Sequence, residues 1–362
     1  MLGDPPGSFG GKMLLYITAD RIGIESGGGV VTKHESLALR ELGDCLVLGQ
    51  EQLQCNGDEP WKWDEKAREI VWREYVHGGK KFELAHFYAG TFGATAKLLR
   101  SIGCKICWTI AAHDVAASKA AHVEMGIPFN YPHLVFEPLW QRYISGYQLA
   151  DTIICPSEVA RSTVRRYPCY CPIEIVPHGC ELPEKIAKLP ERFTVGYMGS
   201  FGPDKGVITL LRAWKKLNWK DALLVLAGRD SVSEFAYRLV KEHGGGNITL
   251  VGWVNNISDF YNSISCYVQP SWTEGFGIEV LEALAHGRPV LCSDGAGAAD
   301  LVPEWYRFPA GDAGKLAAKI EQVKIRGGCT DVGYPEWREI AAEHTWDKIR
   351  SRYVAAWRKM LG

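Results

Sequence analysis

Residues 271–290, with the sequence SWTEGFGIEVLEALAHGRPV, decide the fold of this 362-residue chain. They follow an apolar run at 266–269 that is typical of a buried strand, pass through a glycine-rich loop, and continue at 278–286 with the spacing of a helix. A further apolar run begins at 290. A strand, a helix and another strand in this order predict a parallel sheet with helices on its faces.

The loop in this stretch carries candidate ligand-binding groups. Glu274 lies in it, and Gly275 and Gly277 would let backbone amides approach a ligand closely. The helix that follows directs its N-terminus at the same place, and Glu282 lies on this helix, eight residues after Glu274. The structural alternative is that Glu274 only caps the helix.

The helix at 278–286 has a narrow polar stripe. At about 100° per residue, its polar residues Glu279, Glu282 and His286 lie within roughly 60° of one another, and the rest of the helix is apolar. For Glu279 and His286 we expect no function beyond forming the solvent-exposed face of this helix.

The same alternation of short apolar runs and helical segments extends over the whole chain. We expect strands at 14–18, 45–48, 84–88, 105–110, 152–155, 173–176, 194–198, 222–227, 248–251, 266–269 and 290–292. We expect helices at 30–42, 61–77, 93–102, 206–217, 233–243, 257–263, 278–286 and 345–361. This alternation is typical of doubly wound α/β domains.

A polar, proline-bounded segment at 183–190 interrupts the alternation and predicts a linker. We therefore expect a first Rossmann-like domain at 1–185, a second at 190–343, and a C-terminal helix at 344–362. In such domains ligands bind outside the carboxyl ends of the strands, so two of them predict a cleft lined by strand-to-helix junctions.

Three further motifs stand at such junctions. The turn MGSFGPDKG at 198–206 combines glycines with Lys205 and suits a diphosphate, although a type I turn with a solvated lysine is the alternative. The triple glycine at 27–29 lacks the full dinucleotide spacing, and a flexible turn is equally compatible with it. His113 follows a strand of the first domain and could contact a substrate, or it could be structural.

Composition and charge exclude several classes of protein. The chain has 41 basic and 42 acidic residues, without the basic excess of a nucleic-acid-binding domain. No apolar stretch approaches the roughly 18 residues of a membrane span, and the N-terminus lacks the apolar core of a secretory signal. We therefore expect a cytoplasmic protein. We find no strong metal-ligand cluster, Ser–His–Asp signature or nucleophile elbow, which argues against a metalloenzyme or a hydrolase.

The eleven cysteines are interpreted as reduced and mostly buried. Cys104 and Cys107 have the C-x-x-C spacing of a metal or redox site, but no second pair completes a zinc site. A disulfide among Cys169, Cys171 and Cys180 is left open.

Taken in order along the chain, these motifs resemble the retaining family 4 glycosyltransferases of GT-B fold. The E-x7-E pattern of Glu274 and Glu282 carries the resemblance, and it is specific because further matching segments surround it. These are the glycines at 27–29, IICPSE at 153–158, VPHGCE at 176–181, the phosphate loop at 199–206, LAG at 226–228 and VGWV at 251–254. The resemblance implies two Rossmann-like domains that face a central cleft, with a C-terminal helix that crosses back to the first domain.

The resemblance also implies an activity. The chain would be a hexosyltransferase that moves a sugar from a nucleotide-diphosphate sugar to an acceptor hydroxyl with retention, without a metal or other cofactor. Glu274 would contact sugar hydroxyls, Lys205 would hold the diphosphate and His113 would lie beside the transferred sugar. The other expected donor-binding residues are Gly28, Gly29, Ser200, Arg229, Trp253, Val254, Gly275, Phe276, Gly277 and, at the ribose, Glu282.

The chain departs from the family pattern at two positions. Ser200 stands where the family usually has Arg, which removes a cation from the diphosphate site, although Arg229 could reach in from the next strand end. His178 replaces the usual Asn. A catalytically weak or silent protein that binds sugar nucleotides, and a sugar-nucleotide epimerase, are therefore kept as alternatives.

The acceptor is open between a glycan, a lipid and a small molecule. The small basic cluster Arg161, Arg165 and Arg166 leaves room for a weak peripheral membrane contact. Aromatic residues of the first domain could stack on sugars, but we expect core packing for most of them. They are Trp61, Trp63, Trp72, Phe87, Tyr88 and Trp108.

Overall fold

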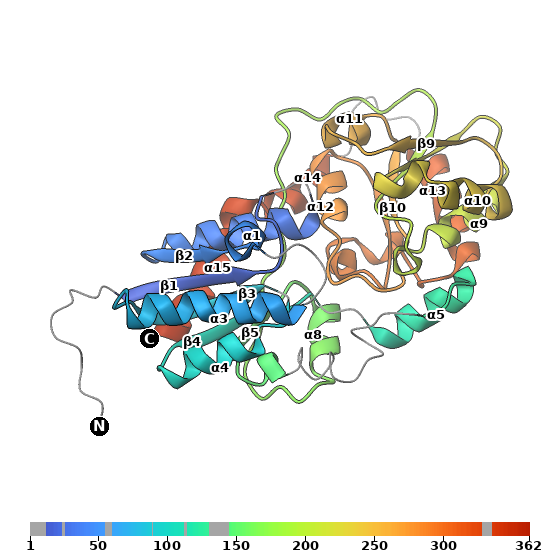
Figure 1. The fold of residues 1–362 in the computed structure, drawn as a ribbon. Coiled ribbons are helices and arrows are strands. Elements are labelled where there is room, and N and C mark those ends of the chain that lie inside the picture. The colour runs from blue at the N-terminus through green and yellow to red at the C-terminus, as the bar shows by residue number, and fades with distance from the viewer. Residues whose placement is uncertain are drawn as a thin grey trace.

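The computed structural model describes residues 12–23, 26–54, 60–88, 90–111, 114–129, 145–327 and 335–362. In these parts the chain forms two six-stranded sheets, and every strand pair in them is parallel. Helices cover the faces of both sheets (Figure 1). None of the described helices is both long and apolar enough to cross a lipid bilayer.

The first sheet has the strand order β2-β1-β3-β4-β5-β6. Its strands are β1 (Lys12–Thr18), β2 (Cys45–Leu48), β3 (Lys81–Tyr88), β4 (Lys105–Thr109), β5 (Thr152–Cys155) and β6 (Ile173–Ile175). Its helices are α1 (Gly27–Arg40), α2 (Gln50–Leu53), α3 (Pro60–Val76), α4 (Gly93–Ser101), α5 (Val115–Met125) and α8 (Glu158–Val164).

The second sheet has the strand order β12-β11-β10-β7-β8-β9. Its strands are β7 (Thr194–Met198), β8 (Leu223–Ala227), β9 (Ile248–Gly252), β10 (Cys266–Gln269), β11 (Val290–Ser293) and β12 (Arg307–Phe308). The helices of this half are α9 (Val207–Leu217), α10 (Glu234–His243), α11 (Ile257–Asn262), α12 (Ile278–Ala285), α13 (Ala313–Gly327) and α14 (Pro335–Ala342). The strand order reverses between β7 and β10, and the loops after these two strands are where a doubly wound sheet binds its ligand.

The strands form where the sequence has short apolar runs because both faces of each sheet are covered. All four residues of β5, β10 and β11 are buried, which is typical of central parallel strands. These runs could therefore be recognised from the sequence alone. The two-residue strand β12 and the helices α2, α5, α8, α13 and α14 were not predicted from the sequence.

The C-terminal helix α15 (Trp346–Leu361) packs on the first sheet. Its buried side chains Ile349, Tyr353 and Trp357 share one hydrophobic cluster with Tyr16 of β1 and Leu84 of β3. The spacing i, i+4, i+8 places these three on one helix face. The predicted fold, with two Rossmann-like domains and a helix that crosses back, is confirmed.

Helix α5 comes from the first half of the chain but packs against the second domain. Met125, at its end, is part of the hydrophobic cluster around β7 and α9, and Glu124 forms an ion pair with Arg212 of α9. In Figure 1, α5 lies beside the second domain. Its alanine-rich sequence has no strong apolar stripe, so no pattern in the sequence indicated this contact.

Two segments that the sequence analysis singled out, the linker at 183–190 and the triple glycine at 27–29, differ in structure. Residues 183–190 contain no helix or strand, and Arg288 Nη2 donates a hydrogen bond of 3.1 Å to the Ala187 carbonyl oxygen. The triple glycine, in contrast, forms the first turn of α1, where the prediction had a turn before a helix beginning near residue 30. The Ser26 side chain caps this turn by accepting a hydrogen bond from the Gly29 amide.

Candidate functional site

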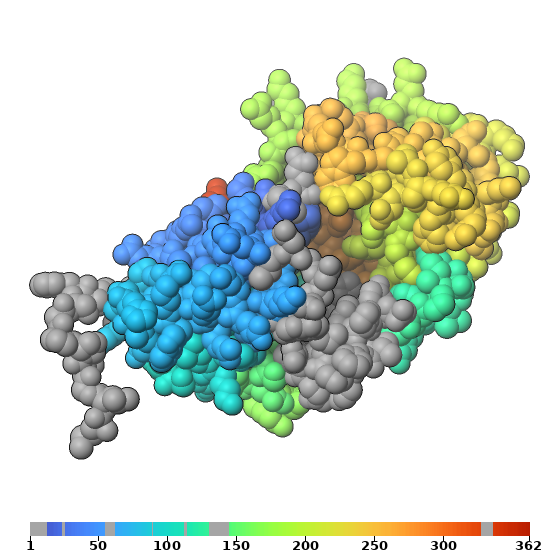
Figure 2. Space-filling model, in the orientation of Figure 1, coloured from blue at the N-terminus to red at the C-terminus, as the bar shows by residue number. Residues whose placement is uncertain are grey.

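The loop at 271–277 follows β10 and touches the first domain. Ser157 Oγ donates to the Gly275 carbonyl oxygen at 2.7 Å, and the Asp114 amide donates to Thr273 Oγ1 at 2.7 Å. A Cβ atom at position 275 would lie 2.9 Å from the Ala111 Cβ, so only glycine fits without displacement. The loop is therefore held at the junction of the two domains, beside which Figure 2 shows a hollow between the blue and the yellow parts of the surface.

Lys205 and Glu274 meet at this junction and form an ion pair. Lys205 ends the short helical turn η1 (Pro203–Lys205) after β7, and Glu274 comes from the loop after β10. Gly206 follows with φ +67°, and a Cβ there would lie 2.0 Å from the Pro270 carbonyl oxygen. Because Gly206 has no side chain, the η1 turn can pack directly against the end of β10. Since β7 and β10 are neighbours in the sheet, this packing brings Lys205 and Glu274 together.

A second carboxylate acts on Lys205. Burial lowers the pKa of Lys205, but Glu274 and Glu279 outweigh it, so the pKa rises above its ordinary value and the amine stays charged. Burial raises the pKa of Glu279, while Lys205 opposes that shift. The expectation of a solvated Glu279 is wrong, because this side chain is half-buried within the charged cluster.

Glu282 lies one helical turn further along α12. Its Oε2 accepts a hydrogen bond of 2.8 Å from the Tyr261 hydroxyl. Burial first, and the charge of Glu279 second, raise the pKa of Glu282 to about 7. Glu282 therefore changes its protonation state close to neutral pH, where a carboxylate is ordinarily ionised.

His286 is also not solvated. Only 2% of it is exposed, its Nδ1 lies 2.7 Å from the Glu282 carbonyl oxygen, and its Nε2 lies 2.9 Å from Ser258 Oγ. Its ring stacks on Tyr261, with the centroids 5.0 Å apart. The prediction of a solvated stripe failed because α11, which carries Ser258 and Tyr261, covers this face of α12.

Two helices begin at the same edge of the sheet with unusual N-termini. α9 begins after Gly206 and α12 after Gly277, both glycines have positive φ, and neither helix has a side-chain cap. Ser26, Asp114 and Ser233 cap α1, α5 and α10 through their side chains, whereas α4 and α15 also lack a side-chain cap but begin after residues with negative φ. First-turn amides without a side-chain acceptor, next to a lysine, suit an anionic ligand.

A chain of buried polar groups lies behind Glu274. The Tyr267 hydroxyl donates to Gln269 Oε1 at 2.8 Å, and Gln269 Nε2 donates to Ser271 Oγ at 2.9 Å. Ser271 Oγ lies 3.5 Å from Glu274 Oε2. These groups hold the loop. Tyr267 and Gln269 are visible in the sequence of β10, but no local pattern indicated that they form a chain with Ser271 and Glu274.

The residues expected near the donor base and diphosphate lie on the neighbouring strand ends. The Arg229 guanidinium stands 5.2 Å over the exposed Trp253 ring, and Val254 beside it is half-buried. The exposed Ser200 accepts a hydrogen bond from the Tyr197 hydroxyl through its carbonyl oxygen, at 2.5 Å. Arg229 is thus engaged with Trp253 in this structure.

Phe276 is buried between the two glycines, with its ring against that of His178 at 5.1 Å. Burial lowers the pKa of His178 to about 4. In the first domain, Gly28 lies against Asp20, since a Cβ there would come within 2.8 Å of its carboxylate oxygen, and Gly29 donates to the Ser26 cap. His113 lies outside the described residues.

Neither a metal cluster nor a thiol pair at Cys104 and Cys107 forms in the described part of the chain. No group of three or more His, Cys, Asp or Glu side chains there is arranged to hold a metal ion. Cys104 and Cys107 are both buried, belong to different hydrophobic clusters, and have pKa values raised by burial. The expectation that these two cysteines are buried is confirmed.

Other expectations concern the surface of the first domain. Arg161 and Arg166 form ion pairs with Glu158 and Asp114, which neutralises part of the basic cluster. Core packing is confirmed for Trp63, Phe87, Tyr88 and Trp108.

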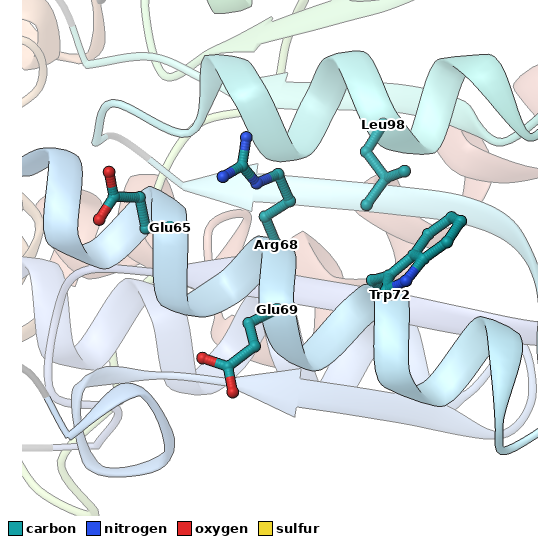
Figure 3. A pocket seen from close by; sticks show the side chains of 5 residues that line it. All are labelled: Glu65, Arg68, Glu69, Trp72 and Leu98. Atoms are coloured by element: carbon teal, nitrogen blue, oxygen red, sulfur yellow. The ribbon is translucent and has the colours of Figure 1, made fainter.

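Trp72 differs, since half of it is exposed, and the side chain of Trp61 is not described. Trp72 lines a hollow of about 270 Å³ on α3 and α4 together with Glu65, Arg68, Glu69 and Leu98 (Figure 3). This hollow is built from helix surfaces and not from strand ends.

Comparison with known proteins agrees with this geometry. Residues 192–324 match the family described as Glycosyl transferases group 1. CapM, a capsular polysaccharide biosynthesis glycosyltransferase of Staphylococcus aureus, is 31% identical over 153 residues, with 40% of each chain covered. LpcC, a lipopolysaccharide core biosynthesis mannosyltransferase of Rhizobium leguminosarum bv. viciae, is 29% identical over 274 residues, which cover 66% of this chain and 76% of LpcC.

Among solved structures, the sucrose-phosphate synthase of Thermosynechococcus elongatus has a TM-score of 0.73 at 17% identity, covering 96% of this chain and 99% of that one. At this identity the likeness concerns the fold alone. The chain spans less than half the length of several curated relatives that it matches, CapM among them. The protein therefore has the GT-B fold, and its second domain belongs to the family of group 1 glycosyl transferases.

Proposed function

We propose that this protein is a retaining glycosyltransferase that moves a hexose from a nucleotide-diphosphate sugar to an acceptor hydroxyl and needs no metal. The observation that carries the proposal is the Lys205–Glu274 ion pair, which lies at the strand-order reversal of the second sheet beside two helix N-termini without side-chain caps. The family of the second domain and the glycosyltransferase names of the relatives support it.

In this proposal the diphosphate of the donor competes with Glu274 for Lys205. Once the amine turns to the diphosphate, the Glu274 carboxylate can accept hydrogen bonds from sugar hydroxyls. The first-turn amides of α9 and α12 add partial positive charge at the same point. Glu282 accepts from the ribose when ionised, and Tyr261 fixes its orientation through the 2.8 Å hydrogen bond.

The bond between the anomeric carbon and the diphosphate oxygen breaks in the proposed reaction. Negative charge then develops on the leaving diphosphate, and preorganised donors such as Lys205 and the helix amides stabilise it. Positive charge develops on the sugar, next to the carboxylate of Glu274. Closely packed domains limit the access of water, which favours transfer over hydrolysis of the donor.

The names of the relatives suggest which substrates to test. LpcC is named as a mannosyltransferase and CapM as an enzyme of polysaccharide biosynthesis. We propose mannose as the first sugar to try and a glycan as the acceptor, bound on the first-domain side of the junction. Lipid-linked acceptors form the second group to test.

The first experiment measures the thermal shift with uridine and guanosine diphosphates and their mannose and glucose derivatives, in EDTA. A ligand that binds only the folded protein raises the melting temperature. Transfer to a panel of glycans follows, and proton NMR of the product reports the anomeric configuration. An inverted product would overturn retention, and strict loss of transfer in EDTA would overturn metal independence.

The Glu274→Ala variant tests the site itself. We expect transfer to be lost while the unfolding curve is kept, whereas Glu321→Ala, at an exposed position of α13, leaves both unchanged. Wild-type activity in Glu274→Ala would contradict the proposal. Donor binding without turnover on any acceptor would favour a silent binding protein, and acceptor-independent conversion of the donor would favour an epimerase.

A further inference from the structure

Two cysteines on one surface loop of the first domain bring their sulfur atoms together. The segment YPCYCP at 167–172 connects α8 to β6, the edge strand of the first sheet. Cys169 Sγ and Cys171 Sγ lie 3.5 Å apart. Cys180, the third cysteine that the sequence left open, is buried, and its Sγ lies 3.9 Å from the Ala341 carbonyl oxygen. The pair therefore consists of Cys169 and Cys171.

This pair is accessible from solvent. Both cysteines are only partly buried, and Tyr170 between them is 92% exposed. Proline precedes Cys169 and follows Cys171, which restricts the backbone on both sides and keeps the thiols close. Six of the other seven cysteines in the described part of the chain are buried, and Cys45 is half-buried.

Cys169 differs in chemistry from the other cysteines in the described part of the chain. The hydrogen bond that it shares with Cys171 lowers the pKa of Cys169 to about 7, whereas the pKa of Cys171 is raised. Burial raises the pKa of Cys45, Cys104 and Cys155 to about 12. Because the thiolate is the nucleophile, Cys169 is the first of these groups to react at neutral pH.

We propose that Cys169 and Cys171 form a redox-active dithiol that exchanges with low-molecular-weight disulfides. The Cys169 thiolate attacks one sulfur of a small disulfide, forms a mixed disulfide and releases one small thiolate. Cys171 then loses its proton to that thiolate and attacks the Cys169 sulfur, which releases the second small thiolate to be protonated by solvent. The protein loses two hydrogens, and its electron pair reduces the small disulfide to two thiols.

The resulting bond would be easy to reduce. A single residue separates the two cysteines, so the bridge closes a small ring under strain, and the loop is exposed to thiols in solution. Both features are typical of labile disulfides rather than of permanent structural ones. The pair is thus a reversible modification site, and it is independent of the glycosyl-transfer proposal.

The test equilibrates the full chain in glutathione buffers of increasing oxidised fraction, quenches with acid and measures the mass of the peptide that contains 167–172. We expect this peptide to lose two hydrogens, and reduced glutathione to restore them. In Cys171→Ser the mixed disulfide with one glutathione should persist on Cys169. Tyr170→Ala, which leaves both thiols in place, should oxidise like the wild type.

A second readout is the alkylation rate of Cys169 against pH. The wild type should show a midpoint near pH 7, and Cys171→Ala, which removes the thiol without putting a hydroxyl in its place, should move it toward the ordinary value of about 8.5. Reduced thiols throughout the buffer series, or a midpoint that Cys171→Ala leaves unchanged, would overturn the proposal. Stable adducts on both cysteines of the wild type would do the same.

Discussion

Each domain holds a carboxylate that accepts a tyrosine hydrogen bond, and the two carboxylates behave in opposite ways. In the first domain the Tyr16 hydroxyl donates to Glu35 Oε2 at 2.7 Å, and His86 Nε2 lies 3.3 Å from the same oxygen. In the second domain Tyr261 donates to Glu282. Burial raises the pKa of both, but His86 and Tyr16 bring the pKa of Glu35 below its ordinary value, whereas that of Glu282 rises to about 7.

The difference follows from what surrounds each group. Glu35 has two hydrogen-bonding neighbours, is fully buried and lies under α15, whose Trp357 Nε1 donates to His86 Nδ1 at 3.2 Å. Glu282 has Tyr261 as its hydrogen-bond donor and a second carboxylate, Glu279, nearby. The neighbours of Glu35 Oε2 keep this carboxylate charged and so support folding, although Glu35 Oε1 has no hydrogen-bond partner among the described residues. A carboxylate with a raised pKa and one protein donor is suited to receive further donors from a ligand.

The largest effect is expected at Lys205, in the half of the molecule that we propose binds the donor. Lys205→Met should reduce transfer by about 10²- to 10³-fold, because the leaving diphosphate loses its charged donor. The folded state should be affected little, since Glu274 and Glu279 are only partly buried and can take up protons. Steady-state kinetics and chemical unfolding of the same preparations measure both quantities.

A surface lysine provides the control for this variant. Lys216→Met, at the end of α9, removes the same charge from the same domain without touching the cluster. Equal losses of transfer in the two variants would mean that net charge, and not the position of Lys205, governs the rate.

The second effect is expected on stability, in the first domain. Glu35→Gln should lower the free energy of unfolding by about 2–4 kcal/mol, because charge-assisted hydrogen bonds in a fully buried site are lost. The pKa of Glu35 is lowered by folding, so its contribution is present above the unfolded value of about 4.3 and is lost as pH falls further. Urea unfolding at neutral and acidic pH should show the difference between wild type and variant shrinking in acid.

Transfer per folded molecule should change little in Glu35→Gln, which separates it from Lys205→Met. The exposed Glu51→Gln, in α2, supplies the matched substitution and should leave stability unchanged. A Glu35→Gln protein as stable as wild type would contradict the view that this carboxylate supports folding.

The two clusters also differ in how far the sequence revealed them. The rule on carboxyl ends was enough to place Lys205 and Glu274 at one cleft, because each lies in the loop after a recognisable strand. Their ion pair was not predicted, since it depends on the order of the strands in the sheet. Glu35, His86 and Trp357 are separated by 51 and 271 residues, and no local pattern links them. Their meeting depends on how α15 docks, which periodicity does not specify.

Glu279 and His286 of α12 were wrongly expected to be solvent-exposed for the same reason, because periodicity does not specify how helices dock. Helical spacing correctly grouped Glu279, Glu282 and His286 on one face, but it cannot tell what covers that face. Tyr261 comes from α11, and its ring and hydroxyl turned an expected surface into a buried one. The docking of α5 on the second domain through Met125 was missed for the same reason.

The third effect concerns pH dependence of donor affinity. If the ribose requires an ionised Glu282, affinity for the nucleotide diphosphate should rise by up to about tenfold between pH 6 and 8, as a group of pKa about 7 loses its proton. Folding raises the pKa of Glu282, so its contribution to stability should fall as the pH rises from about 4.3, the unfolded value, to about 7, and should level off above that. Glu282→Gln should flatten both profiles, and calorimetric titration with wild type and variant cancels the titration of the nucleotide itself.

The smallest effect is expected at Tyr261 and bears most directly on the comparison. Its hydrogen bond lowers the pKa of Glu282, so Tyr261→Phe should raise that pKa and shift the midpoint of donor affinity upward by up to about one pH unit. Affinity at pH 8 and above should then approach that of the wild type. Tyr237→Phe, at an exposed position of α10, should leave the midpoint in place. A midpoint that stays fixed in Tyr261→Phe would show that burial and Glu279 alone set the protonation of Glu282, and that the two tyrosines are not equivalent.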